Sequence, residues 1–158
     1  MRNRPHIPAL TATLVLFLIV GCGGASDSEQ ATPDQAGDQS SLTADQIENG
    51  IGPAVEVNLG PIDEAMAAKG EAIFTSKCAA CHKMDKRYVG PPLADVTKRR
   101  SARFIMNMML NPDQMIREHP TGKEMFATYM TPMPSQNLTE EDARHLLEYL
   151  RTQVPVVE

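Results

Sequence analysis

The sequence predicts an all-α domain over residues 61–158. Three observations lead to this prediction. Apolar residues recur at helical spacing in several stretches, residues suited to capping a helix stand before those stretches, and no strand-like alternation of useful length appears. The whole chain has 158 residues, which is room for one ordinary domain and little more.

The first predicted helix runs over residues 64–76. Asp63 can cap it, because a carboxylate accepts hydrogen bonds from the free N–H groups of a first turn. The chain then enters a loop, since Gly90-Pro91-Pro92 disfavours both helix and strand. A second helix follows its cap, Ser101, and ends at Asn111-Pro112.

Three more helical stretches are expected towards the C-terminus. Two are short, over residues 113–119 and 122–129. Residues 131–134 contain two prolines and must be extended or turn. Thr139 then caps the last helix, residues 140–152, whose first turn is acidic as the helix dipole favours.

The N-terminus is typical of an export signal. Arg2 and Arg4 precede an apolar run over residues 9–20, which is shorter than the roughly 20 residues of a membrane-spanning helix. The run ends in Ile-Val-Gly-Cys at Cys22, which resembles the lipobox of bacterial lipoproteins. This resemblance implies a signal peptide over residues 1–21 and a lipid on Cys22, with the protein on a membrane and facing the periplasm or cell exterior. The alternative is a plain signal peptide followed by an incidental cysteine.

An acidic stretch separates Cys22 from the predicted domain. From Cys22 to Glu64 the chain has nine acidic residues and no Lys, Arg or His. Such a composition predicts a largely disordered, flexible tether over residues 22–60, although the more apolar part after residue 51 is a candidate to lie along the domain. The full chain has a net charge of −5, whereas residues 65–158 carry 13 Lys and Arg against 11 Asp and Glu, a net of +2.

Cys78-Ala79-Ala80-Cys81-His82 has the spacing of a haem-attachment motif. Two thiols three positions apart reach the two vinyl groups on one edge of a porphyrin, and the next residue brings an imidazole to the iron. A redox dithiol would favour a βαβ context, which is missing, and a zinc site needs further ligands, whereas His119 and His145 are single and distant. We therefore expect one covalent haem c on Cys78 and Cys81, with His82 as an iron ligand.

From this motif outwards, residues 64–152 resemble the class I cytochrome c family. That family places its attachment motif just after an N-terminal helix, as here, and packs a Gly and an aromatic of this helix against an aromatic of the last one. Gly70, Phe74 and Tyr149 are similar to that trio. The resemblance implies a small class I cytochrome c fold, with helices wrapped around one covalently bound haem.

Two further segments are similar to parts of the same family. Gly90-Pro91-Pro92-Leu93 looks like its Gly-Pro-x-Leu segment, which implies that the Pro91 carbonyl accepts a hydrogen bond from His82 and that Leu93 presses on the haem face. Met133-Pro134 looks like its distal Met-Pro loop, which implies that Met133 is the sixth iron ligand. Met130, His119 and an open iron site are the alternatives.

Seven methionines lie between residues 106 and 133, so the presence of a Met is not enough to identify a ligand. Met106, Met108 and Met109 fall on a predicted helix, where core packing is the favoured interpretation. The stretch from Asn111 to Met130 is longer than in small family members. The roles of individual family residues are therefore not carried over to this stretch.

The resemblance implies a carrier rather than an enzyme, working in a respiratory chain between a quinol-oxidising complex and a terminal oxidase or reductase. Cations near the motif, such as Lys77, Lys83 or Lys86, would dock transiently on acidic membrane partners. We expect a monomer with no nucleic-acid partner. The alternatives are a haem subunit fixed in a larger complex, and an open-site sensor or peroxidase-like protein.

Overall fold

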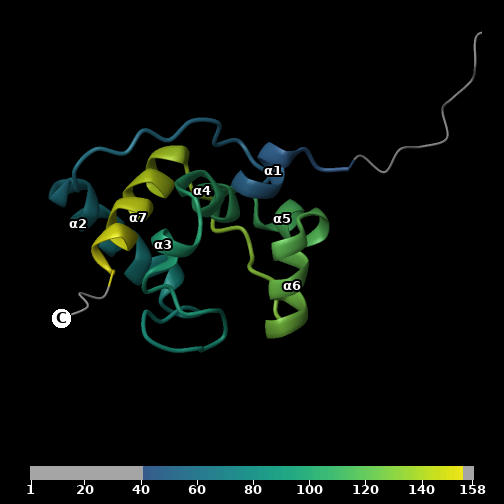
Figure 1. The fold of residues 1–158 in the computed structure, drawn as a ribbon. Coiled ribbons are helices and arrows are strands. Elements are labelled where there is room, and N and C mark those ends of the chain that lie inside the picture. The colour runs from purple at the N-terminus through teal and green to yellow at the C-terminus, as the bar shows by residue number, and fades with distance from the viewer. Residues whose placement is uncertain (1–40, 155–158) are drawn as a thin grey trace, which may run out of the picture. The chain divides into compact units, whose positions relative to one another are not determined.

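A computed structural model describes residues 41–154, which form an all-α domain with no strand in that range (Figure 1). The predicted signal peptide, Cys22 and the first part of the tether lie outside the described residues. In chain order the helices are α1 (Ala44–Asn49), α2 (Glu64–Ile73), the π-helical turn η1 (Phe74–Cys78), α3 (Val96–Arg99), α4 (Ala102–Leu110), α5 (Pro112–Glu118), α6 (Pro120–Tyr129) and α7 (Glu140–Thr152). Helix α4 contacts both α7 and α5. It therefore joins the half of the domain that contains α2 and α7 to the half that contains α5 and α6.

Helices α2 and α7 make the most intimate contact in the domain. Gly70 lies so close to α7 that a Cβ placed there would meet the His145 carbonyl oxygen at 2.1 Å. One turn further along, the rings of Phe74 and Tyr149 pack with their centroids 5.4 Å apart. The expected trio of Gly70, Phe74 and Tyr149 is therefore confirmed as the crossing point of the two helices.

The predicted first helix is correct up to Ile73 and then changes type. Its N-cap is Asp63, whose carboxylate accepts a hydrogen bond of 3.0 Å from the Met66 N–H. From Phe74 the chain forms a π-helical turn, in which the Ala79 N–H donates to the Phe74 carbonyl across five residues at 2.9 Å. Such turns are rare, and they are frequent at functional sites.

Helix α7 supplies the largest part of the core. It begins at a capping box, because the Thr139 hydroxyl accepts from the Asp142 N–H and the Asp142 carboxylate accepts from the Thr139 N–H, each at 3.0 Å. Its apolar face packs against α4 and the end of α2. The buried members of this cluster are Ala54, Phe74, Ile105, Met106, Met109, Ala143, Leu146, Leu147 and Leu150.

A buried carboxylate, Glu148, ties the chain before α2 to α7. It is 0% exposed, forms ion pairs with Arg144 and Arg151, and accepts a hydrogen bond of 2.9 Å from the Asp63 N–H. Burial alone raises the pKa of Glu148, but hydrogen bonds from Arg144, Asp63 and Arg151 outweigh it and hold that pKa below its usual value. Arg151 also donates to the Gly60 carbonyl at 2.7 Å.

The expectation of a largely disordered tether is wrong for the helix over residues 44–49, whereas the more apolar part from residue 51 was a candidate to lie along the domain and begins with residues packed on it. Thr43 and Gln46 form a capping box at the start of α1, and Ile51 and Ala54 are buried. Asn107 on α4 holds this segment: its side chain accepts from the Ala54 N–H at 2.9 Å and donates to the carbonyls of Asn49 and Ala54. These tertiary contacts stabilise a helix too short and too acidic to persist alone.

The segment over residues 112–129 forms two helices that pack closely on each other. Both begin slightly earlier than predicted, at Pro112 and Pro120, because a proline suits the first position of a helix. A Cβ on Gly122 would meet the Met115 carbonyl oxygen at 1.9 Å, so α5 and α6 approach through their backbones. The predicted α4 is confirmed, with the Ser101 hydroxyl accepting from the Phe104 N–H at 3.1 Å, whereas the one-turn helix α3 was not expected.

Replacing Gly70 by Ala should force α2 away from α7. The added Cβ meets rigid backbone and not a flexible side chain, so we expect the free energy of unfolding to fall by about 2–3 kcal/mol or more. Chemical denaturation followed by circular dichroism measures this change. Gly60→Ala is the matched control, since nothing lies within 4 Å of a Cβ there, and equal stability of the two variants would contradict the prediction.

Candidate functional site

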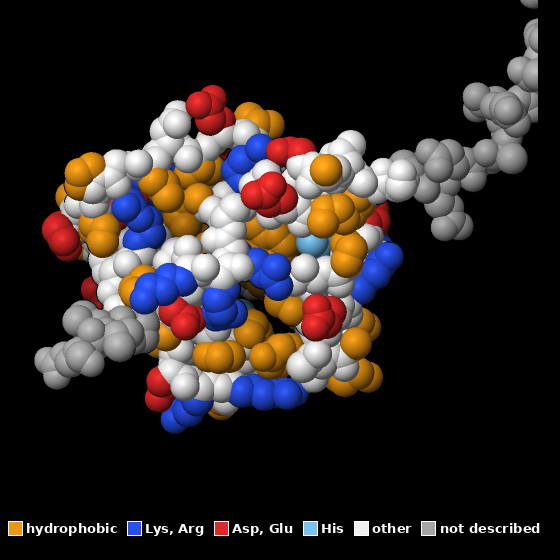
Figure 2. Space-filling model, in the orientation of Figure 1, with side chains coloured by type: hydrophobic (Ala, Val, Ile, Leu, Met, Phe, Trp, Pro, Cys, Tyr) orange, Lys and Arg blue, Asp and Glu red, His pale blue; other side chains and the backbone are white. Residues whose placement is uncertain are grey.

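A cavity of about 700 Å³ lies between the two halves of the domain. Its size falls in the range of cofactor pockets, and its walls are mostly apolar. Figure 2 shows the opening as a hollow with hydrophobic side chains inside, and with several Lys and Arg and some Asp or Glu side chains around it. Cys78, Cys81 and His82 line this cavity together with Pro91, Leu93 and Met133, so the structure brings the predicted haem-site residues into one place.

The imidazole of His82 is held in one orientation. Its Nδ1 lies 3.0 Å from the Pro91 carbonyl oxygen, as the resemblance implied. A carbonyl can only accept, so Nδ1 carries the proton and Nε2 keeps a lone pair. Such a partner fixes the tautomer of a metal-binding histidine and makes the imidazole a better donor to a metal.

Gly90 is the residue that allows this arrangement. A Cβ at Gly90 would meet His82 Cε1 at 2.5 Å and Nδ1 at 2.9 Å. The Gly90 N–H also donates to the Cys81 carbonyl at 2.9 Å, which closes the loop back onto the attachment motif. The Gly-Pro segment therefore places the Gly90 backbone close to the His82 ring and the Pro91 carbonyl at its Nδ1.

Cys78 ends the π-helical turn and Cys81 follows three residues later, and neither forms a disulfide. The Cys78 carbonyl accepts from the Cys81 N–H at 3.0 Å and from the His82 N–H at 2.9 Å, so the motif forms one compact turn. Burial raises the pKa of the Cys78 thiol, and it outweighs the nearby positive charge of Lys77. Both thiols are half-buried and accessible from the cavity.

Of the alternative sixth ligands, only Met133 lines the cavity. It is half-buried, whereas Met130 is 76% exposed and ends α6 in a left-handed conformation. His119 is 1% exposed, and both of its ring nitrogens are hydrogen-bonded, one to the Ile47 carbonyl and the other to the Thr121 N–H. Leu93 is half-buried on the cavity wall, as expected for a residue against a haem face.

The zinc alternative finds no support over residues 41–154. No group of three or more His, Cys, Asp or Glu side chains in that range is placed to hold a metal ion. The cavity instead offers two thiols, one imidazole and a large apolar surface, which are the groups that a covalently bound haem requires.

The family model for cytochrome c matches residues 67–153, from α2 through α7. The chain belongs to the cytochrome c family. It is 33% identical over 87 residues to cytochrome c-551 of Stutzerimonas stutzeri, covering 54% of this chain and 78% of that protein. A solved cytochrome c from Rhodothermus marinus is 49% identical, with a TM-score of 0.66 over 68% of this chain and 94% of that one. Over 35 residues, the chain is 54% identical to a cytochrome c2 of Rhodopseudomonas palustris, covering 22% of this chain and 30% of that protein.

The predicted class I cytochrome c fold is therefore confirmed, and the chain is a monohaem electron-transfer cytochrome with covalent haem c. The cavity fits that group, since it carries both attachment thiols and a pre-oriented imidazole. No helix within the described residues is long and apolar enough to cross a membrane.

Sequence reasoning treated Lys77 only as a docking charge, and it missed the contacts that Lys77 and Arg87 make across the site. Arg87 donates to the Thr128 carbonyl at 2.8 Å and stacks over the Tyr129 ring, with 4.4 Å from its guanidinium carbon to the ring centroid. Lys77 donates to the Gln136 carbonyl at 3.0 Å. Their charge was visible in the sequence, but their partners are backbone carbonyls 41 and 59 positions away, for which a sequence gives no signal.

Substituting Gly90 by Ala should displace the His82 ring. The new Cβ overlaps the imidazole, so the contact with Pro91 is lost, and we expect the protein to lose about 1–3 kcal/mol of stability. Electron paramagnetic resonance of the oxidised protein should report a changed axial histidine. Val89→Ala, at the exposed neighbouring position, is the control, and a wild-type spectrum for Gly90→Ala would contradict this account.

Proposed function

We propose that this protein is a membrane-tethered electron carrier in which His82 and Met133 are the two axial ligands of the haem iron. The observation that supports it is the shared cavity: both side chains line it, beside the two attachment thiols. The haem supplies a one-electron redox centre. The chain fills both axial positions, so no substrate need bind at the iron.

The surroundings of Met133 suit a permanent ligand. It lies between Pro132 and Pro134, which restrict the backbone on both sides. Packing against the main core cluster holds the Met133 side chain inside the domain. A thioether ligand raises the reduction potential of a haem, which suits transfer late in a respiratory chain.

A carrier without catalytic activity also agrees with the polar groups of the cavity. The walls are mostly apolar, and Glu124 of α6 is the one carboxylate among the residues that line them. His119 does not line the cavity, and both of its ring nitrogens are occupied by backbone partners. A buried, closed centre changes its surroundings little between oxidation states, which favours rapid electron transfer over chemistry at the metal.

The mouth of the cavity has the character of a transient docking surface. Four apolar side chains around it are exposed by 38–76%, namely Tyr88, Val89, Phe126 and Met130. Positive charges accompany them, with the Lys83 ammonium 5.0 Å from the Tyr88 ring centroid and Arg87 over Tyr129. The complementary partner is a membrane complex with an acidic rim, and we place the carrier between a quinol-oxidising complex and a terminal oxidase or reductase.

The anchor is proposed from Cys22 and its lipobox-like surroundings. Several acyl chains on one cysteine hold a protein firmly at a bilayer, at about 0.8 kcal/mol for each buried CH₂. The domain itself begins at α1, so the tether available between Cys22 and the domain covers residues 23–42 and not the longer stretch to residue 60.

Met133→Ala should abolish the near-infrared sulfur-to-iron charge-transfer band of the oxidised protein. The reduction potential should fall, because the thioether that favours the reduced iron is gone, and the reduced variant should bind carbon monoxide readily. Met130→Ala, one turn away and exposed, is the matched control and should keep the band. If Met133→Ala keeps the band, the ligand assignment is wrong.

Mass spectrometry of the mature protein tests the anchor. We expect a first residue of Cys22 bearing acyl groups, and a protein that detergent releases from membranes but high salt does not. A chain exported by a signal without the lipobox, starting at Gly23, is the control and should be found free in the periplasm. A mature wild-type chain without lipid would refute the anchor.

A further inference from the structure

The loop that carries Met133 has no backbone support of its own. Between the end of α6 at Tyr129 and the cap of α7 at Thr139, residues 131–138 make no backbone-to-backbone hydrogen bond within the described part of the chain. Two of these residues are prolines, which have no N–H to donate. Whatever holds this loop in place must therefore come from side chains.

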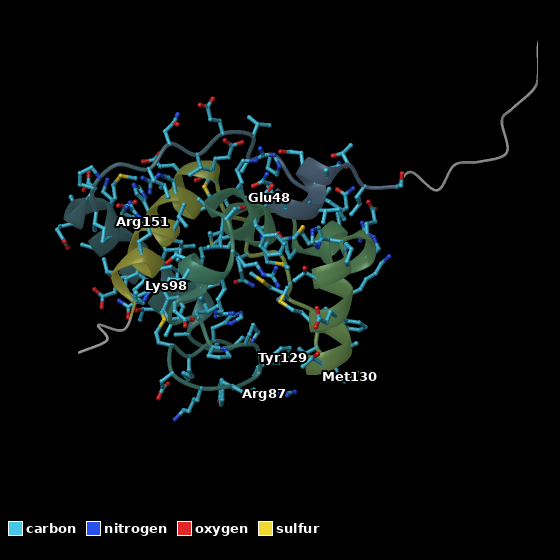
Figure 3. All side chains as sticks on the ribbon, viewed as in Figure 1. Glu48, Arg87, Lys98, Tyr129, Met130 and Arg151 are labelled. Atoms are coloured by element: carbon cyan, nitrogen blue, oxygen red, sulfur yellow. The ribbon has the colours of Figure 1, made fainter. Side chains whose placement is uncertain are left out.

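Two cations of the attachment segment bind the chain on either side of Met133. Before the loop, Arg87 donates to the Thr128 carbonyl at 2.8 Å and stacks on Tyr129 at 4.4 Å. Inside the loop, three residues after Met133, the Gln136 carbonyl accepts from Lys77 at 3.0 Å. Figure 3 shows Arg87 beside Tyr129 and Met130, where the loop after His82 meets the end of α6.

The two cations belong to the side of the site that carries His82. Lys77 is the residue before Cys78 in the π-helical turn, and Arg87 lies in the loop that Gly90 fastens to Cys81. Contacts from Lys77 and Arg87 thus connect the proximal half of the cavity directly to the distal half. We refer to these two residues and their contacts as the clasp.

We propose that the clasp positions Met133, so that Lys77 and Arg87 are positioning residues which keep the thioether on the iron. This inference rests on the proposed ligation by Met133. Opening of the distal loop requires both the loss of the iron–sulfur bond and the release of the clasp. The clasp therefore sets how large a fraction of the protein has an open iron site at any moment.

Arg87 should stabilise the closed distal loop more than Lys77 does. It combines a charge-assisted hydrogen bond with a cation–π contact, and its planar guanidinium can make both at once, whereas Lys77 makes one hydrogen bond from an exposed, flexible ammonium. When Arg87 loses both its hydrogen bond and its cation–π contact, the equilibrium between the closed and the open distal loop should shift by about fivefold to tenfold.

Imidazole binding to the oxidised full-length holoprotein measures the open fraction. Imidazole can take the iron only when Met133 has left it, so its apparent affinity rises in proportion to the open population. We expect Arg87→Ala to bind imidazole about fivefold to tenfold more tightly than wild type, Lys77→Ala about twofold to threefold, and the double variant more tightly than either.

Lys86→Ala is the matched control, because it removes the same charge from an exposed neighbour for which no hydrogen bond or ion pair is recorded among the described residues. Arg87→Lys keeps the charge but loses the stacked plane, and should bind imidazole at least twofold more tightly than wild type. The sulfur-to-iron band supplies a second measurement: in Arg87→Ala it should disappear at a lower imidazole concentration than in wild type.

The outcomes separate this inference from the proposed function. A wild-type protein without the sulfur-to-iron band would refute ligation by Met133 and the clasp with it. A wild-type band together with unchanged imidazole affinity in Arg87→Ala would refute the clasp alone. An equal rise in Arg87→Ala and Lys86→Ala would also overturn it, because the effect would then come from charge and not from contact.

Discussion

The carbonyl oxygen of His145 occupies the space that a side chain at position 70 would need, and this close approach sets the geometry of the whole domain. Because α2 and α7 meet backbone to backbone, the Phe74 and Tyr149 rings can pack at the next turn, and the end of α2 is fixed. The buried Glu148 secures the same pair of helices from the other end. The attachment motif, which follows Phe74 directly, is placed by this crossing.

How much of this could be predicted differs between kinds of feature. Features that depend on neighbouring residues could be predicted. Asp63, Ser101 and Thr139 cap their helices as expected, and the residues of the attachment motif come together as their spacing implied. The short helix α1 could not be predicted, because its acidic composition favours disorder. Contacts from residues far along the chain, Arg103, Asn107 and His119, reverse that preference. Contacts between distant residues, such as Arg87 with Tyr129, leave no pattern in a sequence for the same reason.

The long segment before the ligand loop is explained by what it packs against. Met115 on α5 is fully buried and contacts Ile51. The Ile51 N–H donates to the Met115 sulfur at 3.1 Å. On the following helix, His119 caps α6 and also bonds the Ile47 carbonyl. The helical pair α5–α6 therefore joins the N-terminal segment to the distal side of the haem cavity. The N-terminal segment therefore packs on the helices whose other residues line the distal side of the cavity.

The π-helical turn after Ile73 has a consequence for the phase of the chain. The π-helical turn holds one residue more than a turn of α-helix does. Because each residue of an α-helix rotates the side-chain direction by about 100°, this extra residue changes the direction in which the following side chains point. With this offset, Phe74 packs on Tyr149 of α7 and also lines the cavity, and the cysteines four and seven residues later line it as well. A chain one residue shorter at this turn would keep every chemical group of the motif and direct it elsewhere. In this fold, the motif residues provide the chemical groups, and the π-helical turn before them sets the direction in which those groups point.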